Sequence, residues 1–254
     1  MIPDLHIFPD PEALCRFAAD EFSRFAQAAA KKHHPFRVAL SGGSTPQRLF
    51  TILAAPPHQQ AIPWEFAELF WGDERCVPPD HPESNYFQAY TTLLRSVPIP
   101  QSNIYRIKGE LPPEKAAQDY ADLLARLAPP GLAYPIFDLV LLGMGADGHT
   151  ASLFPGSDPQ ITQPVIPVTA HYQDRPANRV TLTPPVINAA RNILVLVTGE
   201  SKAQALADAL QGKHDPARLP IQRINPVNGK LTWLVDRNAA RMLPSPRQNN
   251  HPNH

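Results

Sequence analysis

Four short runs of mostly apolar residues, each followed by a loop with glycine and polar side chains, constrain this chain most strongly. They span residues 36–40, 66–71, 137–142 and 192–198, and the loops begin SGGSTP, GDER, GMGADGH and TGESK. Strands that are apolar along their whole length are typical of parallel sheets with both faces covered, because antiparallel strands usually alternate apolar and polar residues. The pattern therefore predicts a largely parallel sheet.

Segments with helical spacing alternate with these runs. In residues 10–31, for example, apolar side chains recur every three or four positions and define one face. Helices are predicted at 10–31, 45–55, 84–94, 113–127, 201–210 and 237–243, and further strands at 103–107, 179–183 and 231–235. We expect an α/β fold with a doubly wound, mostly parallel sheet covered by helices on both faces, a Rossmann-like three-layer sandwich. A single domain is expected over residues 1–243, with a disordered tail over 244–254.

Composition excludes several classes of partner. The 254 residues carry 23 basic and 23 acidic side chains, so no charge excess for nucleic acid or an anionic membrane is present. No run approaches the ~18 apolar residues of a membrane span, and the start lacks a basic segment followed by an apolar one. Two distant cysteines make neither a disulfide framework nor a zinc cluster. We expect a cytoplasmic protein without metal or cofactor.

The four loops are expected to meet, since ligands bind beyond the carboxyl ends of parallel strands. In SGGSTP, Gly42 and Gly43 let backbone N–H groups approach an anion, and Ser44 and Thr45 add hydroxyl groups at a helix N-terminus. The loop matches neither the Walker motif nor G-x-G-x-x-G. The alternative is a tight turn in which the Thr45 hydroxyl caps the next helix.

TGESK and GMGADGH add a cation and a candidate base. Lys202 falls near a helix N-terminus, which disfavours a cation unless an anion shares the site; a surface lysine is the alternative. Asp147 and His149 are two residues apart, and an aspartate that holds an imidazole in one tautomer makes it a competent base. The alternative is a capping aspartate with a structural histidine. No H-x-x-x-H or G-x-S-x-G pattern is present, which disfavours a zinc site or a serine nucleophile.

The loop after residue 71 places Asp73, Glu74 and Arg75 together. They either form a self-contained ion cluster or present Arg75, oriented by the carboxylates, to a polar substrate. Taken together, the loops indicate a small phosphorylated substrate and general acid–base chemistry.

The same stretches, in the same order, resemble the 6-phosphogluconolactonases. The resemblance covers most of residues 36–210, with GMGADGHTASLFPGS as its most specific part, and extends to LPIQRINPVNGKLTWLVDRNAA. It implies a hydrolytic domain that converts 6-phospho-D-glucono-1,5-lactone to 6-phosphogluconate in the oxidative pentose phosphate pathway. The related glucosamine-6-phosphate deaminases share the glycine-rich loop, the DGH and the G-x-x-K, but carry an acidic residue downstream of DGH. Here no acid follows until Asp158.

The resemblance also implies roles for individual residues. His149 matches the base that activates water, with Asp147 orienting it, and Arg75 matches an arginine near the reacting carbonyl; Asp73 is grouped with these catalytic residues. Arg179, Lys202 and the loop Gly42–Thr45 match phosphate-binding positions. Two alternatives are a sugar-phosphate deaminase or isomerase on the same fold and a non-catalytic sugar-phosphate sensor. The sequence does not predict an oligomeric state.

Overall fold

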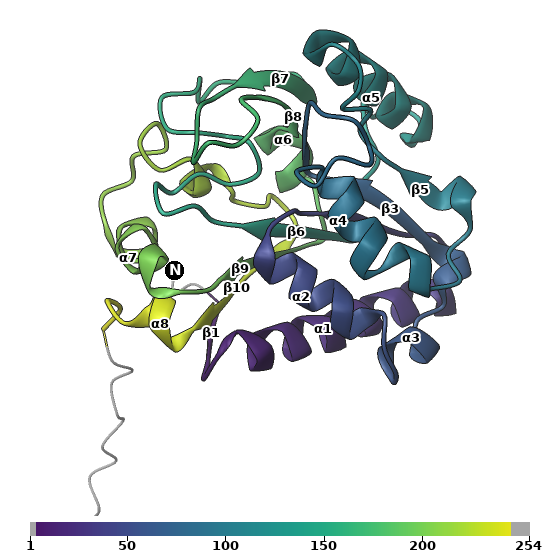
Figure 1. Cartoon of the computed structure of the whole chain (residues 1–254), viewed down its shortest axis with the longest axis horizontal. Helices are drawn as coiled ribbons and strands as arrows, with labels where there is room; N and C mark the ends of the chain where they lie inside the picture. Colours follow the sequence, from purple (N-terminus) through teal and green to yellow (C-terminus); the bar gives the residue numbers. More distant parts are fainter. Residues whose placement is uncertain (1–3, 245–254) are drawn as a thin grey trace, which may run out of the picture.

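The computed structural model describes residues 4–244 and contains two sheets (Figure 1). The larger has seven strands, all paired in parallel, and its edge strand β1 pairs with β10 near the other end of the chain. Its strands, in spatial order, are β1 (Asp4–Phe8), β10 (Lys230–Asp236), β9 (Asn192–Val197), β6 (Leu139–Gly143), β2 (Phe36–Leu40), β3 (Ala67–Trp71) and β5 (Ile104–Tyr105). The predicted α/β class and mostly parallel sheet are confirmed.

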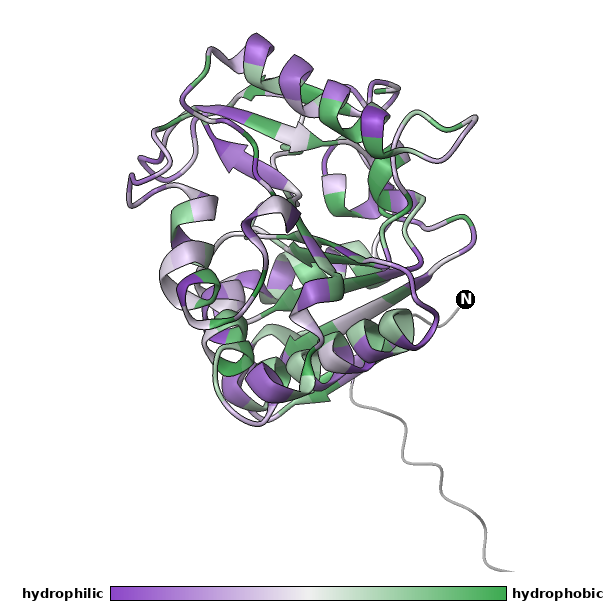
Figure 2. Ribbon diagram, turned by 90° about the vertical axis from the view of Figure 1, so that its right-hand side faces the viewer, coloured by the Kyte–Doolittle hydropathy of each residue, from purple (hydrophilic) through white to green (hydrophobic). Residues whose placement is uncertain are grey.

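Helices cover the large sheet on both sides. Figure 1 shows α1 and α2 on one side and α6 on the other; α5 lies on the side of α6, where it packs mainly against the second sheet described below. The central strands carry mostly apolar residues, whereas the helices carry polar residues on their outer faces (Figure 2). The helices are α1 (Pro11–Lys31), α2 (Ser44–Leu53), α3 (His58–Ala61), α4 (Asn85–Thr92), α5 (Pro113–Leu127), α6 (Pro184–Asn188), α7 (Ala203–Gln211) and α8 (Arg237–Ala240).

A second, three-stranded antiparallel sheet was not expected. It consists of β4 (Asp73–Arg75), β8 (Asn178–Leu182) and β7 (Val165–Thr169), with β8 in the middle. The predicted strand at 179–183 therefore exists, but it pairs here and not in the parallel sheet. In its register Arg75 lies opposite Arg179, so two cations become cross-strand neighbours.

The helix starts agree in part with the predictions. Ser84 caps α4, because its side chain accepts a hydrogen bond from the backbone N–H of Phe87 at 3.1 Å, as expected. The cap expected from Thr45 is wrong: α2 has Gly43 as its N-cap, without a side-chain cap from the described part of the chain. Short 3₁₀ turns connect other elements at residues 64–66, 94–96, 101–103, 200–202 and 220–223.

Most of the buried apolar side chains among residues 4–244 form one hydrophobic cluster that extends from α1 to β10. Over residues 4–244, no helix is both long and apolar enough to cross a membrane. The single domain over 1–243 stays a prediction, and the expected disordered tail lies, apart from Pro244, outside the described residues.

Candidate active site

A pocket of about 250 Å³ opens at the carboxyl ends of β2, β3, β6 and β9. All four glycine-containing loops contribute to its lining, as predicted from the sheet. The large sheet supplies the backbone of the loops after its strands, and the small sheet supplies long charged side chains. The lining includes Ser41, Gly42, Gly43, Ser44, Asp73, Arg75, Gly145, His149, Arg179 and Lys202.

Asp147 and His149 form a tight pair in the loop after β6. The Nδ1 atom of His149 lies 2.6 Å from Oδ1 of Asp147, and the same oxygen accepts the backbone N–H of His149 at 3.1 Å. With Nδ1 donating to the carboxylate, Nε2 is the nitrogen that can accept a proton. Burial alone would raise the pKa of Asp147, but the hydrogen bonds and charge of His149 outweigh it and hold that pKa below its ordinary value.

The packing around His149 depends on a glycine and two aromatic rings. A Cβ atom at Gly145 would lie 2.1 Å from Nδ1 of His149 and 2.5 Å from Oδ1 of Asp147, so only glycine fits there. The rings of Phe154 and Tyr172 lie 4.6 and 4.7 Å from the imidazole, measured between centroids. Residues 150–153 form turns and an isolated bridge, so His149 lies in a loop and not at the start of a helix.

Arg75 and Arg179 are the most buried cations of the lining, with 7% and 3% of their residue surfaces exposed. Nε of Arg75, and Nε and Nη2 of Arg179, have no hydrogen-bond partner among residues 4–244. Burial lowers the pKa of Arg179, and the neighbouring charge of Asp73 opposes that effect. Two buried guanidinium groups with unused donors favour an anionic ligand, because unpaired buried donors are costly.

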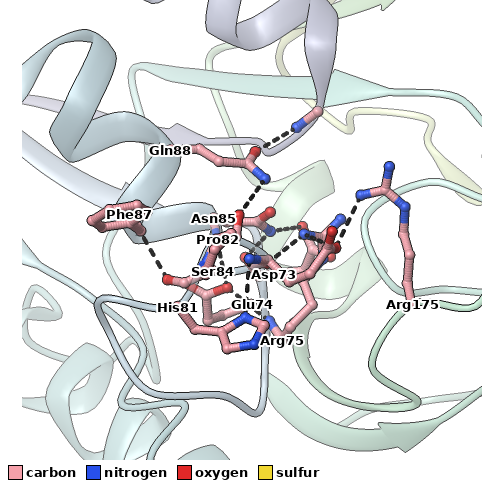
Figure 3. Close-up of polar contacts among 12 residues, drawn as sticks. Asp73, Glu74, Arg75, His81, Pro82, Ser84, Asn85, Phe87, Gln88 and Arg175 are labelled. Carbon is pink, nitrogen blue, oxygen red and sulfur yellow. Dashed lines mark hydrogen bonds and ion pairs between the residues drawn. The ribbon is translucent and has the colours of Figure 1, made fainter.

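The three residues of β4 separate by strand alternation. Asp73 and Arg75 line the pocket, and Ser152 donates to Oδ2 of Asp73 at 2.7 Å. Glu74 points away and accepts hydrogen bonds from the backbone N–H groups of Arg75, Asn85 and Tyr86 and from the Ser84 hydroxyl, at 2.6–3.0 Å (Figure 3). Burial raises the pKa of Glu74 to about 7 against the opposing effect of these hydrogen bonds. The interpretation as a self-contained ion cluster is therefore wrong for Glu74 and Arg75, because their side chains face opposite sides of β4.

The SGGSTP loop approaches the pocket closely through its glycines. A Cβ at Gly42 would lie 1.8 Å from Oδ1 of Asn85, and Gly43 has a φ of 107°, a conformation that favours glycine. The N–H of Gly43 donates to Oε1 of Gln88 (Figure 3). The Thr45 hydroxyl lies 2.7 Å from that of Thr198, so it joins this loop to the loop after β9.

Lys202 also lines the pocket, as the last residue of the 3₁₀ turn 200–202 and the N-cap of α7. It is half-buried, and it forms no ion pair with any residue in the described ranges. Burial lowers its pKa, and the charge of Asp147 opposes that effect. A half-buried lysine facing a pocket agrees with an anionic ligand better than with a surface role.

Sequence reasoning missed several residues of the lining, among them Asn85, Tyr172 and Arg175. Asn85 directly follows the predicted cap Ser84, so its place near the sheet edge had a signal. Tyr172 and Arg175 lie in a loop between β7 and β8, and β7 itself was not predicted. Within residues 4–244, no three His, Cys, Asp or Glu side chains are grouped to hold a metal ion.

Comparisons with known proteins identify the family of this chain. Residues 9–233 match the family model of glucosamine-6-phosphate isomerases/6-phosphogluconolactonase. The chain is 37% identical to a 6-phosphogluconolactonase of Haemophilus influenzae, over 93% of this chain and 98% of the relative. It is 43% identical to a 6-phosphogluconolactonase of Synechocystis, over 81% and 84% of the two chains.

Solved structures give the same result. The 6-phosphogluconolactonase from Trypanosoma brucei superposes with a TM-score of 0.84 at 30% identity, covering 95% of this chain and 99% of that one. A monomeric glucosamine-6-phosphate deaminase superposes with a TM-score of 0.82 at 21% identity, over 94% and 99% of the chains, and therefore shares the fold. By the match of its sequence along most of its length, this chain belongs to the glucosamine-6-phosphate isomerase/6-phosphogluconolactonase family.

Proposed function

We propose that this chain hydrolyses 6-phospho-D-glucono-1,5-lactone to 6-phosphogluconate, in the oxidative pentose phosphate pathway, with His149 as the general base. The observation that carries the proposal is the Asp147–His149 pair in a pocket lined by four cations. Its Nδ1–Oδ1 distance of 2.6 Å leaves Nε2 to take a proton. The cations are Arg75, Arg175, Arg179 and Lys202.

In the first step His149 Nε2 takes a proton from a water molecule, and the water oxygen bonds to C1 of the lactone. The carbonyl electron pair moves onto the carbonyl oxygen, and an arginine donor stabilises the resulting oxyanion. Arg75 is the donor we assign, because its guanidinium faces the pocket with an unused Nε–H. The Asp147 carboxylate stabilises the imidazolium that forms.

In the second step the oxyanion collapses, the bond between C1 and the ring oxygen breaks, and the imidazolium returns its proton to that oxygen. One base in reach of both events closes the cycle without net loss of a proton from the enzyme. Asp73 accepts hydrogen bonds from Ser152 and Asn85, and we assign it to orienting the sugar near Arg75. Lys202, Arg179 and the loop Gly42–Thr45 are assigned to the phosphate.

The lactonase is favoured over a deaminase by the acids near the pocket. Among the lining residues that the structure describes, Asp73 is the only carboxylate. Asp158, the first acid after the DGH segment, accepts a hydrogen bond from the backbone N–H of Gln160 and does not line the pocket. The sensor alternative gives no role to the half-buried Asp147–His149 pair. The cytoplasmic location and the absence of nucleic-acid and membrane partners stay predictions.

The proposal is tested with freshly prepared 6-phosphogluconolactone, by following its loss above spontaneous hydrolysis in the presence of EDTA. We expect wild-type activity, and for His149→Ala a loss of about 10²–10⁴-fold in kcat with a small change in KM. Lys202→Ala is the complementary variant, with a raised KM and weaker 6-phosphogluconate binding. A wild-type rate at background, or ammonia release from glucosamine 6-phosphate, would contradict the proposal.

A further inference from the structure

Arg175 is the least explained cation of the pocket. It lies on the loop that joins β7 to β8, after two residues with positive φ, Gln173 at 51° and Asp174 at 52°. The backbone N–H of Arg175 donates to the carbonyl of Tyr172 at 3.2 Å, so residues 172–175 form a tight turn. Non-glycine residues with positive φ are uncommon and cost free energy. Here three residues of the strained turn line the pocket: Tyr172, Gln173 and Arg175.

The two ends of this turn contact different parts of the pocket. The Tyr172 ring packs edge-on against the His149 imidazole, at 4.7 Å between centroids. Arg175 Nη1 donates a hydrogen bond to Oε2 of Glu83 at 3.2 Å. The turn therefore spans from the candidate base to the charged side of the pocket.

Glu83 contacts two of the pocket cations with one oxygen atom. Oε2 lies 3.2 Å from Arg175 Nη1 and 3.6 Å from Arg75 Nη1, and the Glu83 carbonyl accepts a hydrogen bond from the same Arg75 atom at 2.6 Å. Glu83 itself does not line the pocket. Its carboxylate therefore lies behind the two guanidinium groups and partly neutralises their charge.

The strengths of these contacts differ. Arg75 is held by a backbone carbonyl and its side chain is only 8% exposed, whereas the Arg175 and Glu83 side chains are 38% and 35% exposed. An ion pair that is this exposed contributes little to stability, because solvent screens it and two long side chains must be ordered. A ligand oxyanion that reaches Arg175 from the pocket makes a stronger, better-shielded hydrogen bond.

We infer that Arg175 is an oxyanion-binding residue of this pocket and that Glu83 is its counter-ion in the unliganded protein, displaced when the substrate enters. The inference rests on the proposed function, which supplies two oxyanions: the phosphate of the substrate and the carboxylate formed at C1. Glu83 then sets the affinity for the anionic ligand by competition. The Arg75–Glu83 carbonyl hydrogen bond stays intact throughout.

The test measures 6-phosphogluconate binding by calorimetry for wild type, Arg175→Ala, Glu83→Gln and the double variant. We expect about tenfold weaker binding for Arg175→Ala, equivalent to about 1.4 kcal/mol. Glu83→Gln should bind severalfold more tightly, and this gain should shrink by more than half when Arg175 is absent. Arg24→Ala and Glu21→Gln, from an exposed ion pair on α1, are matched controls and should bind like wild type.

Inorganic phosphate and gluconate, used as competitors, distinguish the two sources of the oxyanion. A selective loss of phosphate competition in Arg175→Ala assigns Arg175 to the phosphate, and a selective loss of gluconate competition assigns it to the carboxylate. Weaker binding by Glu83→Gln would overturn the inference, since Glu83 would then support Arg175 and not compete for it. If Arg175→Ala binds like wild type while the wild-type protein hydrolyses the lactone, the inference is overturned and the proposed function stands. If the wild-type protein neither binds 6-phosphogluconate nor hydrolyses the lactone, both proposals are overturned.

Discussion

Two carboxylates near the pocket, Asp147 and Glu74, have opposite environments. Asp147 lies on the loop after β6 of the large sheet, is partly exposed, and contacts an imidazole that can carry a proton. Glu74 lies on β4 of the small sheet, is 2% exposed, and accepts hydrogen bonds from three backbone N–H groups and a hydroxyl. The pKa of Asp147 is lowered by its histidine, and that of Glu74 is raised by burial to about 7.

The two environments indicate different roles: Asp147 takes part in catalysis, and Glu74 supports the structure of the pocket. A carboxylate beside a histidine stabilises a charge that appears and disappears during a reaction. A carboxylate among neutral donors holds the backbone that carries other groups, here residues 84–86 and, through them, the Asn85 side chain that contacts Asp73. The two residues therefore predict different responses to the removal of their charge.

The largest effect is expected for Asp147→Asn. The amide disfavours the tautomer with the proton on Nδ1 and cannot stabilise the imidazolium, so kcat should fall by about 10²–10⁴-fold. KM for the lactone should change little, because Asp147 contacts the base and not the phosphate groups. Steady-state kinetics on fresh lactone measures both quantities.

Asp158→Asn is the matched control, since it removes the same charge from a loop that does not line the pocket. It should retain wild-type kcat. If kcat of Asp147→Asn lies within threefold of wild type, the Asp147–His149 pair has no role in the mechanism. Asp147 and Glu74 would then both be supporting residues.

Much of the fold was predictable because local patterns dominate it. The runs at 36–40, 137–142 and 192–198 became central strands of the parallel sheet, and the helix at 113–127 has the predicted bounds. The convergence of four loops followed from one rule about parallel strands. For the same reason, the sequence indicated His149, Lys202 and the glycines of SGGSTP and GMGADGH as site residues.

The parts of the fold that the sequence did not predict depend on contacts between residues far apart in the chain. Strand β1 is stabilised by pairing with β10, more than 200 positions away, and β4 is a three-residue strand of charged residues that pairs with β8. Pro167 interrupts the donor pattern of β7, which argues against a strand unless it lies at an edge, as it does here. Arg175 and Tyr172 could not be selected because the turn that carries them depends on this small sheet.

The second prediction concerns Glu74→Gln and the pH dependence of stability. A pKa raised from 4.5 to about 7 on folding means that the folded state binds this proton more tightly than the unfolded state. The free energy of unfolding of wild type, relative to Glu74→Gln, should therefore fall by up to about 3 kcal/mol as pH rises from 4.5 to 7, and then level off. Urea unfolding at several pH values measures this difference.

Asp147→Asn provides the contrasting control. A lowered pKa contributes stability above the ordinary value of 3.8 that is lost as pH falls through the folded value, so the titration of the Asp147 carboxyl itself should add no slope between pH 4.5 and 7. A flat curve for Glu74→Gln as well would mean that the four donors keep Glu74 ionised throughout. The two carboxylates would then differ in role but not in protonation.

The smallest effect is expected for Thr45→Val. The hydroxyl of Thr45 is 2.7 Å from that of Thr198, so the variant loses one hydrogen bond between two loops, worth about 1 kcal/mol of unfolding free energy. The backbone N–H of residue 45 at the start of α2 is retained, so 6-phosphogluconate binding should weaken less than threefold. Thr198→Val should give the same loss, because it breaks the same bond. Strongly weakened binding for Thr45→Val alone would assign the hydroxyl to the phosphate, making this loop a side-chain site and not a backbone one.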